Sequence, residues 1–131
     1  MGYLLDTSIA VHLRDGDAWA TARLRQLDQD AFISAITRVE LESGIYAQPE
    51  LTERRRAAVR ALLTFLPVLD FDSDMAEAYG TILQTTGFSR RKIIDRMIAA
   101  TALVEGLILI TCNCDDFTDV PGLELLVWDV G

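Results

Sequence analysis

Cysteine and histidine, the side chains that form disulfide frameworks and structural zinc sites, are scarce in this sequence. The only cysteines are Cys112 and Cys114, separated by Asn113 alone, and the only histidine, His12, lies far away in the chain. This spacing suits neither a disulfide framework nor a tetrahedral zinc site. We therefore predict two reduced thiols on or near a buried strand, and an ordinary helical role for His12.

Long apolar runs are also absent, although half of the 131 residues are hydrophobic. No run approaches the roughly 20 residues that a membrane-spanning helix requires. The chain begins Met1-Gly2-Tyr3-Leu4-Leu5-Asp6, with no basic region and with an acid where a signal peptide would be apolar. The sequence predicts one domain over residues 1–131, with one core, no membrane contact and a cytoplasmic location.

Positive charge is in short supply, because 12 lysines and arginines face 20 aspartates and glutamates, for a formal charge of −8. This balance argues against a nucleic-acid-binding protein, since phosphate contacts need lysine and arginine. Two features weaken the objection. Acids that bind metal cations would be neutralised, and the positive charges are clustered in residues 54–60 and 90–96. Such clusters more often form solvated helix faces, so they carry only modest weight as binding surfaces.

Strand-like and helix-like segments alternate along the chain. Short apolar strands are expected at residues 3–5, 31–34, 68–71, 107–111 and 125–128. Helices are expected to begin at Thr7 and to cover residues 18–27, 36–47, 52–65, 73–85, where Ser73 caps the helix, and 91–105. Helices between continuously apolar strands are typical of a parallel sheet covered on both faces, so we expect an α/β fold with a mainly parallel sheet of about five strands.

Several acids follow directly after expected strands. Asp6 comes after the first strand, and Asp115 and Asp116 come shortly after the strand that ends near Thr111. In an open parallel sheet ligands bind beyond the carboxyl ends of the strands, so these acids are expected on the same rim. Each has a structural alternative: Asp6 can cap a helix, and Asp115 or Asp116 can stabilise a turn.

Two further acids lie on helix faces that are otherwise apolar or small. Glu40 shares its stripe with residues 36, 43, 44 and 47, which predicts close packing around a carboxylate that is costly to bury unpaired. Asp95 lies on one face with residues 98, 99 and 102, near a helix N-terminus that favours an anion. A structural ion pair between Asp95 and Arg91 or Arg96 is the alternative.

Together, Asp6, Glu40, Asp95 and Asp116 fit the chemistry of a divalent cation. Hard cations such as Mg²⁺ take oxygen ligands, commonly carboxylates with water and substrate phosphate. One or two such cations can activate water and stabilise the leaving oxygen of a phosphodiester. Repulsion among clustered carboxylates should raise the pKa of at least one of them. No glycine-rich phosphate loop is present, which argues against a nucleotide-binding protein.

Four short runs occur in an order and spacing that resemble those of PIN-domain proteins: Leu4-Leu5-Asp6-Thr7-Ser8, Ile36-Thr37-Arg38-Val39-Glu40-Leu41, Ile94-Asp95-Arg96-Met97-Ile98-Ala99-Ala100 and Thr111-Cys112-Asn113-Cys114-Asp115-Asp116-Phe117. The match extends through Val120-Pro121-Gly122-Leu123 to the final strand, and so covers essentially the whole chain. In length and detail the sequence resembles the VapC-type toxins of bacterial or archaeal toxin–antitoxin modules. The resemblance implies a three-layer α/β/α sandwich of the PIN type.

The same resemblance implies an endoribonuclease toxin that depends on Mg²⁺ or Mn²⁺ and cleaves tRNA or rRNA. It also implies a homodimer, neutralisation by a cognate antitoxin, and DNA contact only through that antitoxin. Family positions map onto Asp6, Glu40 and Asp95 as catalytic metal ligands. The fourth position maps onto Asp116, while Asn113 stands at a neighbouring position that is acidic in some family members.

Accessory roles follow for several neighbours of these acids. Ser8 stands where many relatives have asparagine, and its hydroxyl either orients a ligand or water or caps the following helix. Arg91, Lys92 or Arg96 would help to hold the RNA backbone while a metal-bound water attacks a phosphate. The regions 45–46 and 62–65 are candidates for antitoxin contact, although core packing also accounts for most of their residues.

Two other classes of function are compatible with parts of the sequence. A receiver-type phospho-acceptor would need an aspartate at the end of a middle strand, for which Asp70 is a candidate, and a lysine at the end of a late strand, where Thr111-Cys112-Asn113 offers none. A metal-binding or interaction module without turnover is the second alternative. Metal binding without cleavage of a broad RNA panel would distinguish it from a nuclease.

Overall fold

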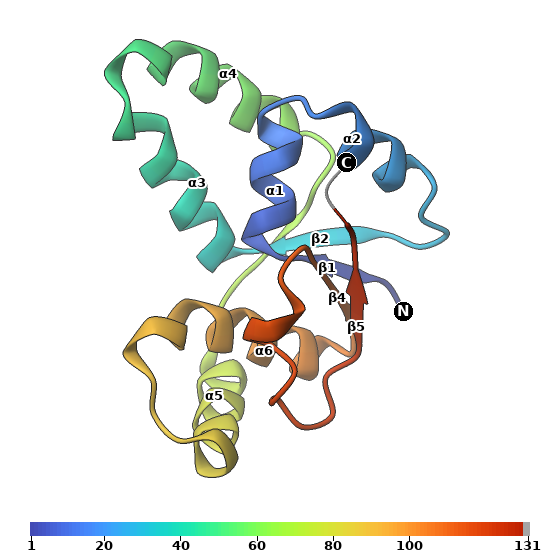
Figure 1. Cartoon of the computed structure of the whole chain (residues 1–131), viewed down its shortest axis with the longest axis vertical. Coiled ribbons are helices and arrows are strands. Elements are labelled where there is room, and N and C mark those ends of the chain that lie inside the picture. Colours follow the sequence, from blue (N-terminus) through green and yellow to red (C-terminus); the bar gives the residue numbers. More distant parts are fainter. Residues whose placement is uncertain (130–131) are drawn as a thin grey trace.

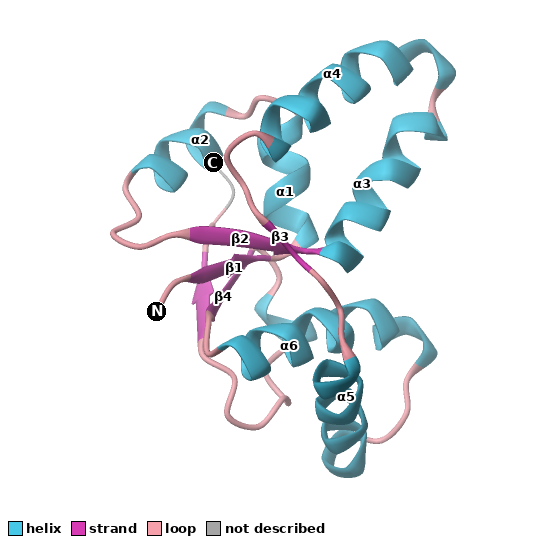
Figure 2. Cartoon of the chain, turned by 180° about the vertical axis from the view of Figure 1, so that it is seen from behind, coloured by secondary structure: helices cyan, strands magenta, loops and turns pink. Residues whose placement is uncertain are grey.

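Five short strands form one parallel sheet in the order β3-β2-β1-β4-β5. They are seen in a computed structural model that describes residues 1–129. Neighbouring strands are parallel throughout, with Leu4 of β1 level with Phe32 of β2 and Leu109 of β4. The strands are β1 (Tyr3–Leu5), β2 (Ala31–Ser34), β3 (Val68–Leu69), β4 (Ile108–Thr111) and β5 (Leu125–Val127). Figure 2 shows their common direction, and the predicted parallel sheet is confirmed.

Helices cover both faces of this sheet (Figure 1). Four of them lie on one face: α1 (Thr7–Arg14), α2 (Ala18–Arg25), α3 (Ala35–Ala47) and α4 (Thr52–Leu63). The other face carries α5 (Ser73–Thr86) and α6 (Ile93–Glu105). Short 3₁₀ turns complete the connections: η1 (Pro49–Leu51), η2 (Arg90–Lys92) and η3 (Cys114–Asp116). The predicted three-layer α/β/α sandwich is therefore confirmed.

Alternation along the central strands supplies a separate apolar core for each face. Leu5 and Ile110 pack with α1 to α4, whereas Leu4 and Leu109 pack with α5 and α6. All four side chains are fully buried. Successive strand residues point to opposite faces, so a strand covered on both sides must be apolar without interruption. This explains why runs such as 108–110 alternate with amphipathic helices in the sequence.

Most element boundaries agree with the sequence predictions to within two residues, and one capping residue was wrongly assigned. α5 begins at Ser73, as expected, but its cap is Asp72, whose carboxylate accepts a hydrogen bond from the Met75 amide at 3.0 Å. α6 ends at Glu105, as predicted, because the next residue, Gly106, adopts the left-handed conformation with φ of 67°. Within the described part of the chain, none of the helices is long and apolar enough to cross a membrane.

The surroundings of the two cysteines and of the single histidine indicate structural roles for these residues. Both cysteines are free and partly buried, and burial raises the pKa of the Cys112 thiol. His12 lies on α1, where its Nδ1 atom is 2.6 Å from the Asp17 carboxylate and its ring packs edge-on against Trp19. The helical role predicted for His12 is confirmed, and Asp17 is a partner that the sequence did not indicate.

Truncation of the core under α3 should destabilise the protein strongly. Leu41 is fully buried in the cluster between α3 and the sheet, so we expect Leu41→Ala to cost about 2–5 kcal/mol of unfolding free energy. The neighbouring Val39 side chain is 60% exposed, so Val39→Ala should change stability by less than about 0.5 kcal/mol. Urea denaturation of both variants measures the difference. Equal losses would show that α3 packs through another face.

Candidate active site

Asp6 links the end of β1 to the start of α1, and its carboxylate is held by three donors. The Thr7 amide donates to Oδ1 at 2.8 Å. The hydroxyls of Ser8 and Thr111 donate to Oδ2 at 2.9 and 2.8 Å. Asp6 is only 5% exposed. It therefore caps α1, as one alternative predicted, while its second oxygen is fixed at the carboxyl edge of the sheet by hydroxyls from α1 and β4.

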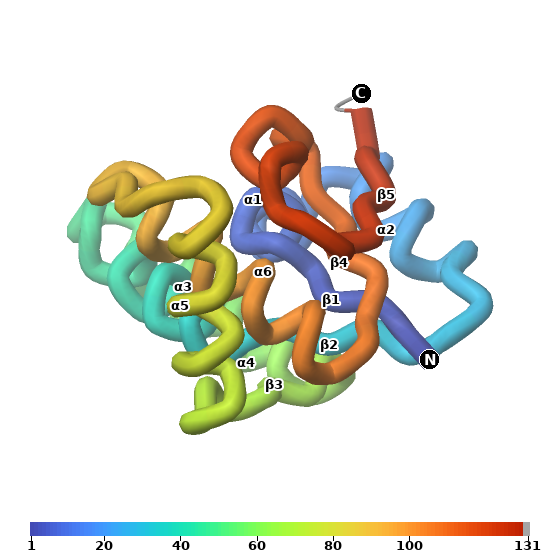
Figure 3. Tube along the Cα trace, turned by 90° about the horizontal axis from the view of Figure 1, so that it is seen from below, coloured from blue at the N-terminus to red at the C-terminus, as the bar shows by residue number. Residues whose placement is uncertain are grey.

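The two hydroxyls that hold Asp6 also bind the chain after β4. The Cys112 amide donates to the Ser8 hydroxyl at 3.3 Å, and the Asn113 amide donates to the Thr111 hydroxyl at 3.0 Å. The Ser8 hydroxyl therefore joins the Asp6 carboxylate to the chain after β4, while the helix cap is Asp6 and a role of Ser8 toward a ligand or water stays a prediction. Thr111 was missed, although a threonine at the end of an apolar strand was a usable signal. Figure 3 shows β1 lying between β2 and β4, which brings these residues together.

The pKa values of two acids show that the four candidate carboxylates influence one another. Burial raises the pKa of Asp6 despite its three hydrogen bonds, and the charge of Asp116 raises it further. The pKa of Asp95 is raised to about 6, first by burial and then by the charges of Asp6, Asp116 and Glu40, against the opposing effect of Arg91. The predicted rise in at least one pKa is thus confirmed, and the structure brings these four acids into one electrostatic neighbourhood.

This raised pKa predicts a pH dependence of stability in the absence of divalent cations. Because the pKa of Asp95 is about 6 in the folded chain and has its ordinary value of 3.8 in the unfolded chain, the folded state holds this proton more tightly. The associated stability is present below pH 3.8 and is lost as the pH rises through about 6. Asp95→Asn should therefore gain stability relative to the wild type between about pH 4.5 and pH 7. Urea denaturation of both proteins in the presence of a chelator, at pH 4.5 and pH 7, tests this prediction. An unfolding free-energy difference between the two proteins that is the same at both pH values would contradict it.

Glu40 does not have the closely packed surroundings that its helical stripe predicted. The buried residues of α3 are Thr37, Leu41 and Ile45, whereas residues 43 and 47 are exposed and Glu40 itself is partly exposed. The interpretation was wrong because α3 contacts the core through a neighbouring stripe. Asp95 follows its prediction more closely, since residues 98, 99 and 102 on its face are buried in the apolar core beneath α6.

Among the acids after β4, Asp116 is the one whose charge acts on the other candidates. It lies in η3 and is partly buried, whereas Asp115 and Asn113 are exposed. Its charge raises the pKa of both Asp6 and Asp95. Asp70, the residue required by the receiver-type alternative, follows β3 at the edge of the sheet and not a middle strand.

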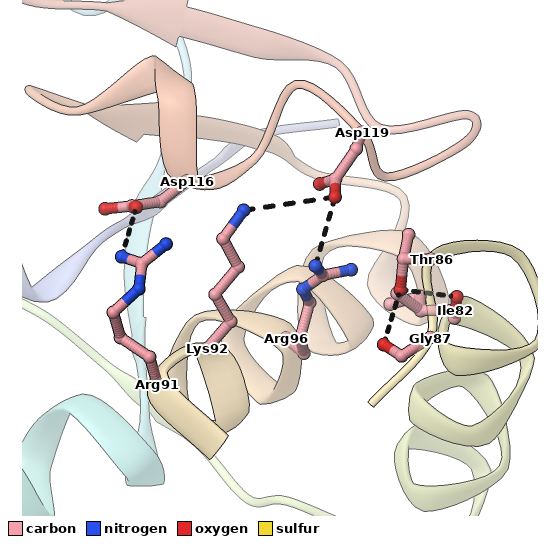
Figure 4. A network of polar contacts seen from close by, with 8 residues as sticks. All are labelled: Ile82, Thr86, Gly87, Arg91, Lys92, Arg96, Asp116 and Asp119. Atoms are coloured by element: carbon pink, nitrogen blue, oxygen red, sulfur yellow. Dashed lines mark hydrogen bonds and ion pairs between the residues drawn. The ribbon is translucent and has the colours of Figure 1, made fainter. Parts of the chain in front are cut away.

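The basic residues near the site fall into two groups (Figure 4). The Arg91 side chain is 74% exposed, and its Nη1 lies 3.5 Å from Asp116 Oδ1. The Arg96 side chain is only 3% exposed and pairs with Asp119, its Nη2 lying 3.1 Å from Oδ2. The RNA contact expected of Arg96 does not fit this setting, because its helical position turns the guanidinium into the protein. Neither arginine forms the structural ion pair with Asp95 that was the alternative.

The donor set has the chemistry of a hard-cation site. Four carboxylates supply only oxygen ligands, and the charges of three of them add to the effect of burial in raising the pKa of Asp95, a repulsion that a cation would relieve. Within residues 1–129, no three such side chains are gathered into a single coordination sphere. These residues fit a divalent cation in charge and ligand type, but not in their spacing in this structure.

The fold and site have counterparts among known proteins. The family model for the PIN domain matches residues 3–123. The chain belongs to the PIN domain family. Curated PIN-domain relatives include the tRNA(fMet)-specific endonuclease VapC of Shigella flexneri, which is 30% identical over 96% of this chain and 97% of that protein. Ribonuclease VapC1 of Rickettsia felis is 33% identical over 96% of each chain. These matches place this PIN domain among the VapC ribonucleases.

Solved structures of VapBC proteins share this fold. VapBC2 from Rickettsia felis, bound to a DNA fragment from its promoter, gives a TM-score of 0.87 at 27% identity and covers 98% of this chain and 100% of that one. DNA-bound VapBC from Salmonella typhimurium gives a TM-score of 0.84 at 28% identity, with 98% of both chains covered. Both neighbours are VapBC toxin–antitoxin assemblies.

Proposed function

We propose that this chain is an endoribonuclease toxin that uses Mg²⁺ or Mn²⁺, and that Asp6, Glu40, Asp95 and Asp116 are its catalytic metal ligands. The observation that carries this proposal is the convergence of acids from the end of β1, from α3 and from η3 on Asp95 in α6, where their charges add to burial in raising the Asp95 pKa to about 6. Acids held together at such an electrostatic cost are typical of functional sites. Membership of the VapC ribonucleases supports the reaction class.

The chain's own residues contribute orientation and charge to this site. Three donors keep the Asp6 carboxylate in one orientation, and Glu40 and Asp95 approach from helices on opposite faces of the sheet. Arg91, exposed beside Asp116, is placed to bind a phosphate of the RNA backbone. A bound divalent cation would supply charge neutralisation for the phosphate and activation of the attacking water.

Transfer RNA is the substrate class that we favour over ribosomal RNA. The relative from Shigella flexneri is named as a tRNA(fMet)-specific endonuclease. A panel of purified tRNAs and rRNA fragments, with cleavage sites mapped by primer extension, would decide between the two classes. Cleavage confined to rRNA would contradict this choice while leaving the ribonuclease proposal intact.

The second proposed partner is a cognate antitoxin, supported by the VapBC assemblies among the structural neighbours. Of the regions considered from sequence, Ile45 and Leu62 are buried in the core, whereas Tyr46 and Phe65 are 60% and 55% exposed. We therefore propose that Tyr46 and Phe65 are the residues of these regions that contact the antitoxin. We also propose that the chain forms a homodimer and that it contacts DNA only indirectly, through the antitoxin.

Removal of divalent cations tests the proposed function directly. The chain, purified free of antitoxin, should cleave structured RNA in Mg²⁺ or Mn²⁺, lose this activity in EDTA, and regain it when excess cation is restored. The physical reason is that the carboxylates alone repel phosphate. Cleavage that persists unchanged in EDTA would overturn the proposal, and metal binding without cleavage of any RNA would favour a non-catalytic module.

A further inference from the structure

A set of ion pairs joins the two segments that carry Asp95 and Asp116 (Figure 4). The first segment, η2 with the start of α6, provides Arg91, Lys92 and Arg96, and the second, the loop after β4, provides Asp116 and Asp119. Arg96 Nη2 and Lys92 Nζ lie 3.1 and 3.9 Å from the same oxygen, Asp119 Oδ2. Arg91 Nη1 lies 3.5 Å from Asp116 Oδ1.

These contacts differ greatly in burial. The Arg91 side chain is 74% exposed, so its contact with Asp116 contributes little. The Arg96 side chain is 3% exposed, and its Nε and Nη1 atoms have no hydrogen-bond partner within residues 1–129. Asp119 is the one ion-pair partner of this guanidinium in that part of the chain. A buried charge without a counter-ion is strongly unfavourable. Conformations of the loop that keep Asp119 beside Arg96 are therefore favoured in free energy.

The position of this ion pair in the chain connects it to the acidic site. Arg96 directly follows Asp95 in α6, and Asp119 lies three residues after Asp116. Phe117 and Val120, 1% and 5% exposed, anchor the same loop in the apolar core beneath α6. Apolar packing therefore keeps the loop against α6, while the directional ion pair fixes the position of the loop along that helix.

We propose that Arg96 and Asp119 are positioning residues, and that the ion pair between the buried guanidinium and the 46% exposed carboxylate holds Asp116 beside Asp95 and thereby sets the cation affinity of the acidic site. This inference rests on the proposed function, since it concerns the ligands of the same cation. It gives Arg96 a role that does not require contact with RNA.

Calorimetric titration of the purified chain with Mn²⁺ tests this role without reference to catalysis. Asp119→Asn should weaken Mn²⁺ binding about tenfold, as is usual when a residue supporting metal ligands is lost. Asp119→Glu should restore most of the affinity, because it returns the negative charge to Arg96. Glu124→Gln removes an exposed acid that forms no ion pair in the described chain, and it should leave the affinity unchanged.

A double-mutant cycle separates positioning from general destabilisation. If the ion pair is the cause, Arg96→Gln and the double variant with Asp119→Asn should each show about the same tenfold loss, not a product of two losses. Circular dichroism at the titration temperature checks that each variant is folded. If Arg96→Gln does not fold, the comparison of Asp119→Asn with Asp119→Glu decides.

The outcomes for the two proposals are distinguishable. Wild-type chain that binds Mn²⁺ and cleaves RNA, together with folded Asp119→Asn of unchanged affinity, would overturn the positioning role and leave the proposed function standing. Wild-type chain that neither binds Mn²⁺ nor cleaves RNA would overturn the proposed function itself.

Discussion

Asp95→Ala should reduce RNA cleavage by more than about 100-fold, because loss of residues that merely support metal ligands already costs about 10–100-fold. The carboxylate lies in the first turn of α6, half-buried and repelled by three other acids. Removing it takes away a ligand and also relieves this repulsion. The variant should therefore be folded, and at neutral pH without divalent cations it should be at least as stable as the wild type.

A matched control for Asp95→Ala is available on the neighbouring helix. Asp74 also lies in the first turn of its helix, α5, but it is exposed and does not contribute to the raised pKa of Asp6 or Asp95. Cleavage rates on one tRNA, with melting temperatures in EDTA, should separate the two variants. Equal activity of Asp95→Ala and Asp74→Ala would remove Asp95 from the proposed site.

Sequence patterns among neighbouring residues were sufficient to predict which acids lie at the carboxyl edge of the sheet. Asp6 and Asp116 were found because they follow strands whose carboxyl ends meet at one edge of a parallel sheet. The sheet itself was predictable because β1 and β4 are covered on both faces and are therefore apolar without interruption. Sequence patterns of this kind depend on residues that are near one another in the chain.

Contacts between distant segments were not predictable in the same way. The hydrogen bond from Thr111 to Asp6 joins residues 105 positions apart, and the pair of Arg96 with Asp119 depends on how a loop folds over α6. Glu40 shows a related limit, because helical periodicity defines a stripe but not whether that stripe or its neighbour packs on the sheet. Tertiary packing decides each of these cases.

Substitutions of Asp6 should separate its capping role from its role in the site. Asp6→Asn retains a side chain that caps helices as well as aspartate does, and the rotatable hydroxyls of Ser8 and Thr111 can bond to the amide. We expect its unfolding free energy to stay within about 1 kcal/mol of wild type. Asp6→Ala loses the cap and leaves the proton of the buried Thr111 hydroxyl without its acceptor, so it should be less stable by about 2–4 kcal/mol.

Both Asp6 variants should lose more than about 100-fold in cleavage rate, because neither keeps the negative charge of a carboxylate ligand. Chemical denaturation and tRNA cleavage, measured on the same preparations, give the unfolding free energy and the cleavage rate of each variant. The asparagine variant is the informative one, since it is expected to be nearly as stable as the wild type and yet inactive. An Asp6→Asn chain that cleaves RNA at the wild-type rate would show that Asp6 serves α1 as a cap and takes no part in the proposed metal site.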